Sequence, residues 1–298
     1  MLGAAARGRG IRPLSAFGDV EMSDCADGSR LVYSCDRREA EVVVKRFQSG
    51  CRNGARREWA GLHLLLEHAP GLAPRPLRED VSSDVAVISM ERLVGQPLRG
   101  LELSETHLAA LAPALNSLMY APPLTAIADL EVARSRPEQV LPRLHEPIGS
   151  GVDLPRPVVQ ALRLSQEWAT KTSLIEGPLD CQTVFGHGDG NLANYLYDGS
   201  RVQIVDFEDC GRSDRPCELA EIVEHIAFWH EAGFSPTSLT CLFDLNRAEQ
   251  DRLLECRRMH ASAWLRILIS DLLSDRPRNH PETLAKQAGR LLCLLDEG

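Results

Sequence analysis

Two carboxylates and one amide are spaced so that a single hairpin could bring them to one end of a small sheet. Asp189 and Asn194 are five positions apart in a polar loop, and Asp206 directly follows the β-branched run 202–205. The turn dipeptide Asp198-Gly199 lies between the loop and that run. A hairpin around this turn would fold Asp206 back beside the other two side chains.

This trio suits the transfer of a phosphoryl group. Mg²⁺ that bridges nucleotide phosphates takes hard oxygen ligands, and Asn194 and Asp206 can supply them. An attacking hydroxyl also needs a group that orients it and accepts its proton, and Asp189 can serve in that role. Each of these residues alone is an ordinary turn residue, so the prediction depends on the whole set and its strand context.

The surrounding residues make a family resemblance visible. His187-Gly188-Asp189, with Asn194 and then Asp206-Phe207-Glu208, resembles the motifs of the aminoglycoside phosphotransferase and choline kinase family, small-molecule relatives of the protein kinases. The resemblance covers about residues 25–230. It implies an α+β, bilobal protein-kinase-like fold, with a small β-rich N-terminal lobe and a larger helical C-terminal lobe.

Two further positions bear on this resemblance. Glu218-Leu219-Ala220 is similar to the acidic residue and Leu-Ala that often follow in the family, whereas Asn191 stands where many members have histidine. The resemblance implies a nucleotide-binding lobe over residues 1–92 and a lobe that binds the acceptor and carries catalysis over residues 93–298.

Two charged residues of the N-terminal half resemble the kinase phosphate-positioning pair. Lys45 ends a β-branched strand, Val42 to Val44, as in the kinase motif, and could reach the α- and β-phosphates. Glu58 lies in the first half of an expected helix, 53–68, where a kinase glutamate would pair with that lysine. The alternatives are a solvated lysine and a surface salt bridge between Glu58 and its flanking arginines.

The remaining nucleotide contacts are implied by position alone. Gly28 and Ser29 lie where the family has a short phosphate-covering loop, although G-x-G-x-x-G is absent. Met90, Glu91 and Leu93 lie where a hinge between lobes would offer backbone groups to the adenine edge. The cofactors that follow from the resemblance are ATP, as phosphoryl donor, and Mg²⁺.

Composition limits the partners. The net charge is −9 and aromatic residues make up 5% of the 298-residue chain, which argues against nucleic acid as a partner. Residues 1–92 hold 14 Lys and Arg against 13 Asp and Glu, and residues 93–298 hold 19 against 29. The acidic second part could attract a cationic acceptor, or it could simply aid solubility.

The cysteines and the apolar residues indicate a cytoplasmic protein. Nine cysteines are scattered without a C-x-x-C pair, which favours reduced thiols. No apolar run has the length of a membrane span, and residues 1–18 lack the apolar core of a signal peptide. We expect no membrane partner, and either a monomer or a homodimer.

Periodicity predicts a mostly helical second half. Helices are expected over residues 104–120, 157–172, 219–229, 247–273 and 282–295, and strands over 31–35, 41–47 and 85–90. The family resemblance, together with the acidic second part of the chain, implies ATP-dependent phosphorylation of a small cationic alcohol such as an aminoglycoside, which would be an antibiotic-resistance activity. The alternatives are a metabolic kinase for choline, ethanolamine, homoserine or a sugar, and a non-catalytic nucleotide-binding protein.

Overall fold

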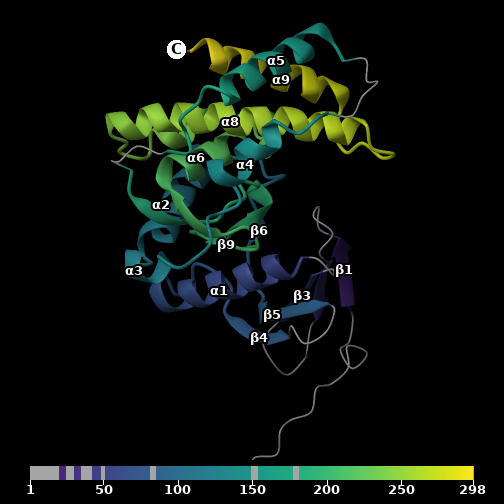
Figure 1. The fold of residues 1–298 in the computed structure, drawn as a ribbon. Coiled ribbons are helices and arrows are strands. Elements are labelled where there is room, and N and C mark those ends of the chain that lie inside the picture. The colour runs from purple at the N-terminus through teal and green to yellow at the C-terminus, as the bar shows by residue number, and fades with distance from the viewer. Residues whose placement is uncertain are drawn as a thin grey trace, which may run out of the picture. The chain divides into compact units, whose positions relative to one another are not determined.

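The structure is a computed structural model that describes residues 20–24, 30–34, 42–47, 51–80, 85–148, 154–176 and 181–297. It contains two compact units (Figure 1). Unit 1 holds the described residues up to Ala55 together with Pro76–Arg92, and unit 2 holds Arg56–Arg75 and Leu93–Gly298. All residues after Arg92, the position at which the sequence predicts the lobe boundary, belong to unit 2. The earlier segment 56–75 also belongs to unit 2. The functional assignment of each lobe stays a prediction.

Unit 1 is built on a five-stranded sheet whose neighbouring strands are all antiparallel, in the order β1-β2-β3-β5-β4. Lys45 in β3 lies opposite Ile88 in β5. Both strands expected before residue 50 are present, as is the strand expected over residues 85–90. The strands are β1 (Val20–Asp24), β2 (Arg30–Ser34), β3 (Val42–Phe47), β4 (Pro76–Asp80) and β5 (Ala86–Glu91).

Unit 2 is mostly helical and carries two small sheets, one of β7 and β10 and one in the order β6-β8-β9. The helix α1 (Arg52–His68) enters this unit at Arg56. The strands are β6 (Gln96–Pro97), β7 (Thr183–Gly186), β8 (Tyr195–Tyr197), β9 (Val202–Ile204) and β10 (Gly211–Asp214). The other helices are α2 (Glu105–Tyr120), α3 (Leu124–Ile127), α4 (Pro137–Leu144), α5 (Arg156–Ala169), α6 (Arg215–Glu224), α7 (Pro236–Thr240), α8 (Arg247–Leu272) and α9 (Pro281–Asp296).

One predicted helix was wrong at both ends. The helix expected over residues 219–229 begins earlier, because the Asp214 carboxylate caps α6 by accepting the Cys217 backbone N–H at 3.0 Å. It ends at Glu224, since His225 has the extended ψ of 136°. A π-helical segment, Ala227–Glu231, then replaces the expected last turns.

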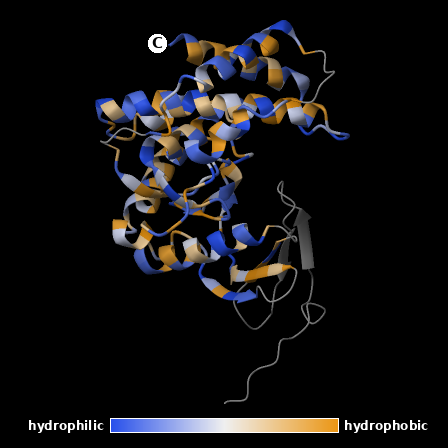
Figure 2. Ribbon diagram, viewed as in Figure 1, coloured by the Kyte–Doolittle hydropathy of each residue, from blue (hydrophilic) through white to orange (hydrophobic). Residues whose placement is uncertain are grey.

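The long helix α8 organises the C-terminal part of unit 2, lying between α6 and α4 on one side and α5 and α9 on the other (Figure 1). The ribbons of α5, α8 and α9 alternate between polar and apolar residues, as amphipathic helices do (Figure 2). Their apolar residues form one buried cluster, which includes Val158, Leu265, Leu268, Leu284 and Leu291. This cluster fixes α8, from which His260 and Arg252 extend toward α6 and its N-terminus.

Shortening a buried side chain of this cluster should destabilise the protein. Leu265 is fully buried, so Leu265→Ala is expected to lower the free energy of unfolding by about 2–5 kcal/mol, through lost burial and the cavity left behind. Ile267 lies on the same helix but is 45% exposed, and Ile267→Ala should change it by less than about 1 kcal/mol. Urea denaturation measures both values, and equal losses would contradict this account of the core.

Two expectations about the environment can be compared with the described residues. None of their helices combines the length and the apolar character that crossing a bilayer requires. The seven cysteines among them, Cys51, Cys181, Cys210, Cys217, Cys241, Cys256 and Cys293, are all free thiols. Cys25 and Cys35 lie outside the described residues.

Candidate active site

Two short strand pairs frame the loop that the sequence singles out. β7 pairs antiparallel with β10 and runs into the loop 187–194, while β8 and β9 form the predicted hairpin, with Tyr195 opposite Ile204. Gly199 takes the positive φ of 100° in the turn between them. The Val205 backbone N–H then donates to the Asn194 carbonyl at 2.9 Å. The residue before Asp206 is thus hydrogen-bonded to the end of the loop.

Asp189 is held by its own loop. One carboxylate oxygen accepts the Asn191 backbone N–H at 2.9 Å, and the other accepts the Asn194 side-chain amide at 2.8 Å. Burial raises the pKa of Asp189 to about 6, with Glu221 and Asp206 adding to the increase and His187 opposing it. The structure therefore brings the predicted hydroxyl acceptor and one predicted metal ligand into direct contact.

His187 has a structural place in this loop. Its two ring nitrogens contact the carbonyl oxygens of Asp189 and Val205, each at 2.9 Å. The ring is buried and packs edge-on against Phe207, with centroids 4.9 Å apart. His187 therefore connects the loop 187–194 to the strand end that precedes Asp206.

A buried glutamate from α6 anchors the start of the loop. One carboxylate oxygen of Glu218 accepts the backbone N–H groups of His187 at 2.8 Å and Gly188 at 3.2 Å. Its other oxygen accepts the Ser135 hydroxyl at 3.2 Å. Gly188 has φ +82°, and a Cβ there would lie 2.3 Å from the Asp209 carbonyl oxygen, so only glycine fits. The glutamate of the Glu-Leu-Ala motif therefore holds the start of the loop in place.

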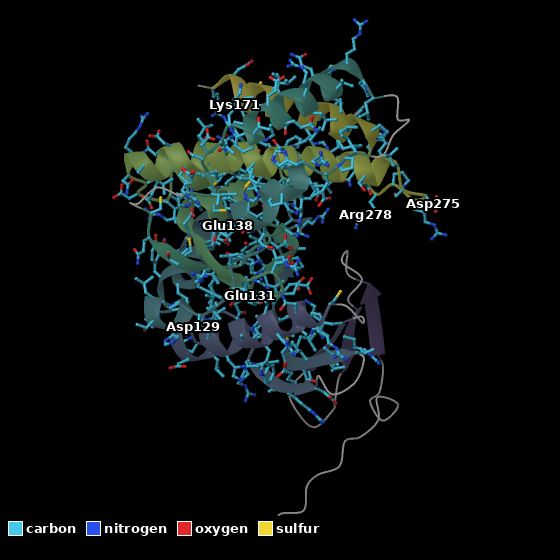
Figure 3. The ribbon with its side chains drawn as sticks, viewed as in Figure 1. Asp129, Glu131, Glu138, Lys171, Asp275 and Arg278 are labelled. Carbon is cyan, nitrogen blue, oxygen red and sulfur yellow. The ribbon has the colours of Figure 1, made fainter. Side chains whose placement is uncertain are left out.

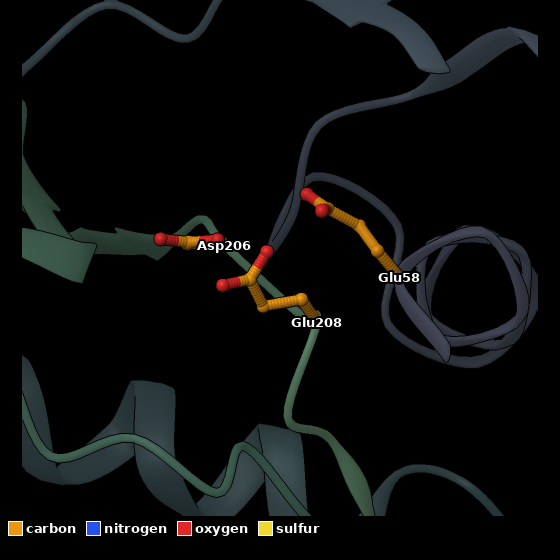
Figure 4. A group of neighbouring side chains, drawn as sticks. All are labelled: Glu58, Asp206 and Glu208. Carbon is orange, nitrogen blue, oxygen red and sulfur yellow. The ribbon is translucent and has the colours of Figure 1, made fainter. Parts of the chain in front are cut away.

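Three carboxylates converge after β9. Oxygen atoms of Glu58, Asp206 and Glu208 all lie within 4.8 Å of one another (Figure 4). Asp206 has φ 71° and is the one non-glycine residue with positive φ in the described part of the chain. Aspartate is among the residues that tolerate this region best. The turn directs its carboxylate toward Glu208, which the sequence prediction did not include among the ligands, although the Asp-x-Glu pattern signalled it.

This donor set fits a hard divalent cation. Carboxylate oxygens are what Mg²⁺ and Ca²⁺ take from proteins, and a cation would relieve the repulsion among three neighbouring negative charges. Asn194 donates through its amide nitrogen to Asp189, which leaves the amide oxygen as the atom it can offer to a metal. The roles of Asn194 and Asp206 as ligands stay predictions.

Arg57 positions the neighbouring Glu58. Its guanidinium donates to the carbonyls of Val132 at 2.9 Å and Cys210 at 2.8 Å, and it pairs with Glu131, which is labelled in Figure 3. Cys210 follows Glu208 by two residues. These bonds fix α1 against the segment that carries the other two carboxylates.

The predicted nucleotide-binding residues are distributed over both units. Lys45 is buried in unit 1, with its Nζ 4.8 Å from the centre of the Phe47 ring, and Glu58 is buried in unit 2. Their ion pair would join the units and stays a prediction. Met90 is buried at the end of β5, Glu91 and Leu93 are half-buried, and their adenine contacts are likewise predictions. Gly28 and Ser29 lie outside the described residues.

A largely buried ion pair joins α6 and α8. His260 of α8 contacts a Glu221 carboxylate oxygen at 2.5 Å, and its side chain is only 2% exposed. Burial opposes the charged imidazole, but Glu221 outweighs it and raises the pKa of His260 to about 10. Burial alone would raise the pKa of Glu221, but the neighbouring His260 lowers it. Both groups are therefore charged at neutral pH.

This pair predicts a pH-dependent stability. Because the folded-state pKa of about 10 exceeds the unfolded value of about 6.5, the stabilisation is complete below pH 6.5 and is lost as the pH rises toward 10. Between pH 6 and 10 the wild type should lose on the order of 3 kcal/mol of unfolding free energy more than His260→Gln. Urea denaturation at both pH values measures this, and equal losses would contradict the assignment.

Comparison with known proteins identifies the family of this chain. A model of the Phosphotransferase enzyme family matches residues 26–249. The chain belongs to this family. A search of curated proteins finds no match. The mixed α and β, protein-kinase-like fold that the sequence predicts is confirmed by solved structures that share it.

Solved structures share this fold at low sequence identity. A choline/ethanolamine kinase family protein from Mesorhizobium loti is 18% identical, with a TM-score of 0.60 over 94% of this chain and 88% of that one. An amicoumacin kinase in complex with AMP-PNP and Ca²⁺ is 12% identical, with a TM-score of 0.67 over 91% and 87%. A spectinomycin phosphotransferase in complex with ADP and spectinomycin is 13% identical, with a TM-score of 0.57 over 93% and 89%.

Proposed function

We propose that this protein transfers the γ-phosphoryl group of ATP to a hydroxyl group of a small, cationic molecule such as an aminoglycoside. The observation that carries the proposal is the Asp189 carboxylate, oriented by Asn194 at 2.8 Å in the loop whose end is bonded to the residue before Asp206. Family membership supports phosphotransferase chemistry. The acceptor class goes beyond what that membership establishes.

Asp189 acts on the acceptor in this proposal. Its carboxylate orients the attacking hydroxyl and takes its proton as the bond to phosphorus forms. Because the transition state is loose, correct placement of the hydroxyl contributes more than early removal of its proton. Two hydrogen bonds from Asn191 and Asn194 give the carboxylate that placement.

The other predicted residues act on the nucleotide and its metal. Asn194 and Asp206 hold Mg²⁺, and the convergence of Glu208 and Glu58 on Asp206 supports a divalent site there. When bound, Mg²⁺ offsets negative charge on the phosphates. Lys45 binds the α- and β-phosphates. The remaining proposed contacts to ATP are Gly28 and Ser29 at the phosphates, Glu58 as the partner of Lys45, and the backbone of Met90, Glu91 and Leu93 at adenine.

The acidic part of the chain supports a cationic acceptor. Residues 93–298 carry 29 Asp and Glu against 19 Lys and Arg. An aminoglycoside would make the activity one of antibiotic resistance in the cytoplasm. Choline and ethanolamine, as acceptors of a metabolic kinase, fit the same charge, and one of the similar structures belongs to a choline/ethanolamine kinase family.

A screen of acceptors tests the proposal. ADP release would be measured for purified protein with ATP and Mg²⁺ against aminoglycosides, choline, ethanolamine, homoserine and neutral sugars, and products would be identified by mass spectrometry. Preferred turnover of an aminoglycoside supports the proposal, and preferred turnover of a neutral or anionic acceptor rejects its cationic half. Nucleotide binding without phosphorylation of any member would instead favour a non-catalytic protein.

Salt should weaken the use of a cationic acceptor. If the acidic part of the chain attracts the acceptor, kcat/KM should fall several-fold between about 50 and 300 mM salt, because exposed charges are screened over a Debye length of about 8–10 Å near physiological salt. A neutral acceptor that the enzyme also phosphorylates is the control and should show little change. Equal salt dependence for both acceptors would contradict electrostatic attraction.

A further inference from the structure

The helix α6 presents two carboxylates to the catalytic loop, one helical turn apart. Glu218 accepts the backbone N–H groups of His187 and Gly188. Glu221, three residues further on, receives a backbone hydrogen bond from Gly190. We propose that Glu221, held in place by His260, is a positioning residue that sets the orientation of Asp189. This inference rests on the proposed phosphotransferase function, in which Asp189 orients the acceptor.

The loop packs directly on the backbone of α6 at this point. A Cβ on Gly190 would lie 2.5 Å from the Glu221 carbonyl oxygen and 2.7 Å from the Ile222 Cα, which no side chain could relieve by moving. The residue after Asp189 is thus both in contact with the helix and hydrogen-bonded to its carboxylate. A small shift of Glu221 would therefore move the peptide that carries Asp189.

His260 fixes the carboxylate that makes this contact. Its Nδ1 lies 2.5 Å from a Glu221 oxygen, and its Nε2 lies 3.8 Å from the sulfur of Cys217, which is on α6 with Glu221. The His260 side chain is 2% exposed and the Glu221 side chain 15%, so the contact is largely shielded from water and is correspondingly strong. Without His260, Glu221 would be a buried charge without its main counter-ion and would adopt another position.

The peptide of Asp189 is then fixed from both sides. Its carbonyl oxygen contacts His187 Nδ1 at 2.9 Å and accepts the Tyr195 hydroxyl at 3.4 Å. The following N–H is held by Glu221. A displacement of about 1 Å at such a group can reduce turnover on the order of 10²-fold. Glu221 contributes to catalysis through this placement, without touching the acceptor.

A matched set of variants tests the proposal. Glu221→Gln keeps the shape of the side chain, His260→Gln replaces the ring with a neutral amide, and each removes the ion pair. Glu224→Gln is the control. Glu224 lies on the same helix, is fully buried, and pairs instead with Arg257 at 2.7 Å and Arg290 at 2.6 Å. Glu221→Gln and His260→Gln should lower kcat about 10- to 100-fold, with the ADP dissociation constant within about twofold of wild type.

The control separates positioning from stability. Glu224→Gln should lower the melting temperature but leave kcat within about threefold of wild type, because its ion pairs are made with α8 and α9 and not with the loop. The double variant of Glu221 and His260 should lose no more turnover than the more impaired single variant, since the pair acts as a unit. Additive losses in kcat, or an equal loss in Glu224→Gln, would overturn the proposal.

Hydrogen exchange gives a readout that does not depend on activity. Backbone exchange of the peptide spanning residues 187–194 should be faster in Glu221→Gln and His260→Gln than in Glu224→Gln. If the wild type phosphorylates no acceptor, the proposed function fails, and this measurement still decides whether Glu221 holds the loop. Wild-type exchange of this peptide in both variants would overturn the positioning role.

Discussion

Asp206→Asn is expected to lower kcat at least about 10³-fold while the protein stays folded, because a charged ligand of the proposed Mg²⁺ site would supply several kcal/mol of transition-state stabilisation. The carboxylate removed is one of three whose oxygens lie within 4.8 Å of one another. Single-turnover phosphoryl transfer at ordinary Mg²⁺ concentration measures the effect. Wild-type turnover under these conditions would remove Asp206 from the proposed metal site.

Asparagine is the right replacement because of the backbone. Asp206 has φ 71°, a region that asparagine tolerates and alanine does not, so Asp206→Ala would combine a strained backbone with the lost ligand. Asp209→Asn makes the same change three residues further on, at a carboxylate that pairs with Arg134 at 3.4 Å. That control should keep turnover within about threefold and keep the rise in melting temperature that Mg²⁺ and nucleotide produce. Asp206→Asn should lose that rise.

Asp189→Asn should lower kcat by about 10²- to 10⁴-fold, the usual contribution of a positioned proton acceptor. The variant lacks the basic group and also has only one acceptor atom for the two N–H donors that now hold the carboxylate. The ADP dissociation constant should stay within about twofold, since the proposed role of Asp189 is to orient the acceptor hydroxyl and not to bind the nucleotide.

Calorimetry and steady-state kinetics on the same preparation separate these two effects. A large loss of ADP affinity in Asp189→Asn would show that the carboxylate serves the nucleotide, contrary to its proposed role. A kcat within tenfold of wild type would show that another group orients the acceptor hydroxyl.

Local patterns predicted the parts of the site that lie close together in sequence. The spacing of Asp189, Asn194 and Asp206 around the Asp198-Gly199 turn specified a hairpin, and the structure contains it. The strand that bears Lys45 was also predictable, because β-branched residues on a half-buried strand leave a clear signal.

Contacts between distant segments were not predictable from spacing. Glu58 and Glu208 are 150 positions apart, and only the packing of α1 brings their carboxylates together. The start of α6 had a local signal, Asp214 followed by Pro216, but apolar periodicity alone suggested a later start. The break at His225 has no comparable mark in the sequence, because it depends on the packing that surrounds residues 225–231.

The contacts between the loop 187–194 and α6 have a consequence for synthesis on the ribosome. The N–H groups of His187 and Gly188 find their acceptor 30 or so residues later, at Glu218, and the partner of Glu221 follows only at His260. When β7 and β8 have emerged from the ribosome but Glu218 has not, the backbone N–H groups of the loop between them still lack their acceptor. We expect the active conformation to form only after most of the chain has left the exit tunnel, and C-terminal truncation before α8 should yield a chain with an unformed loop.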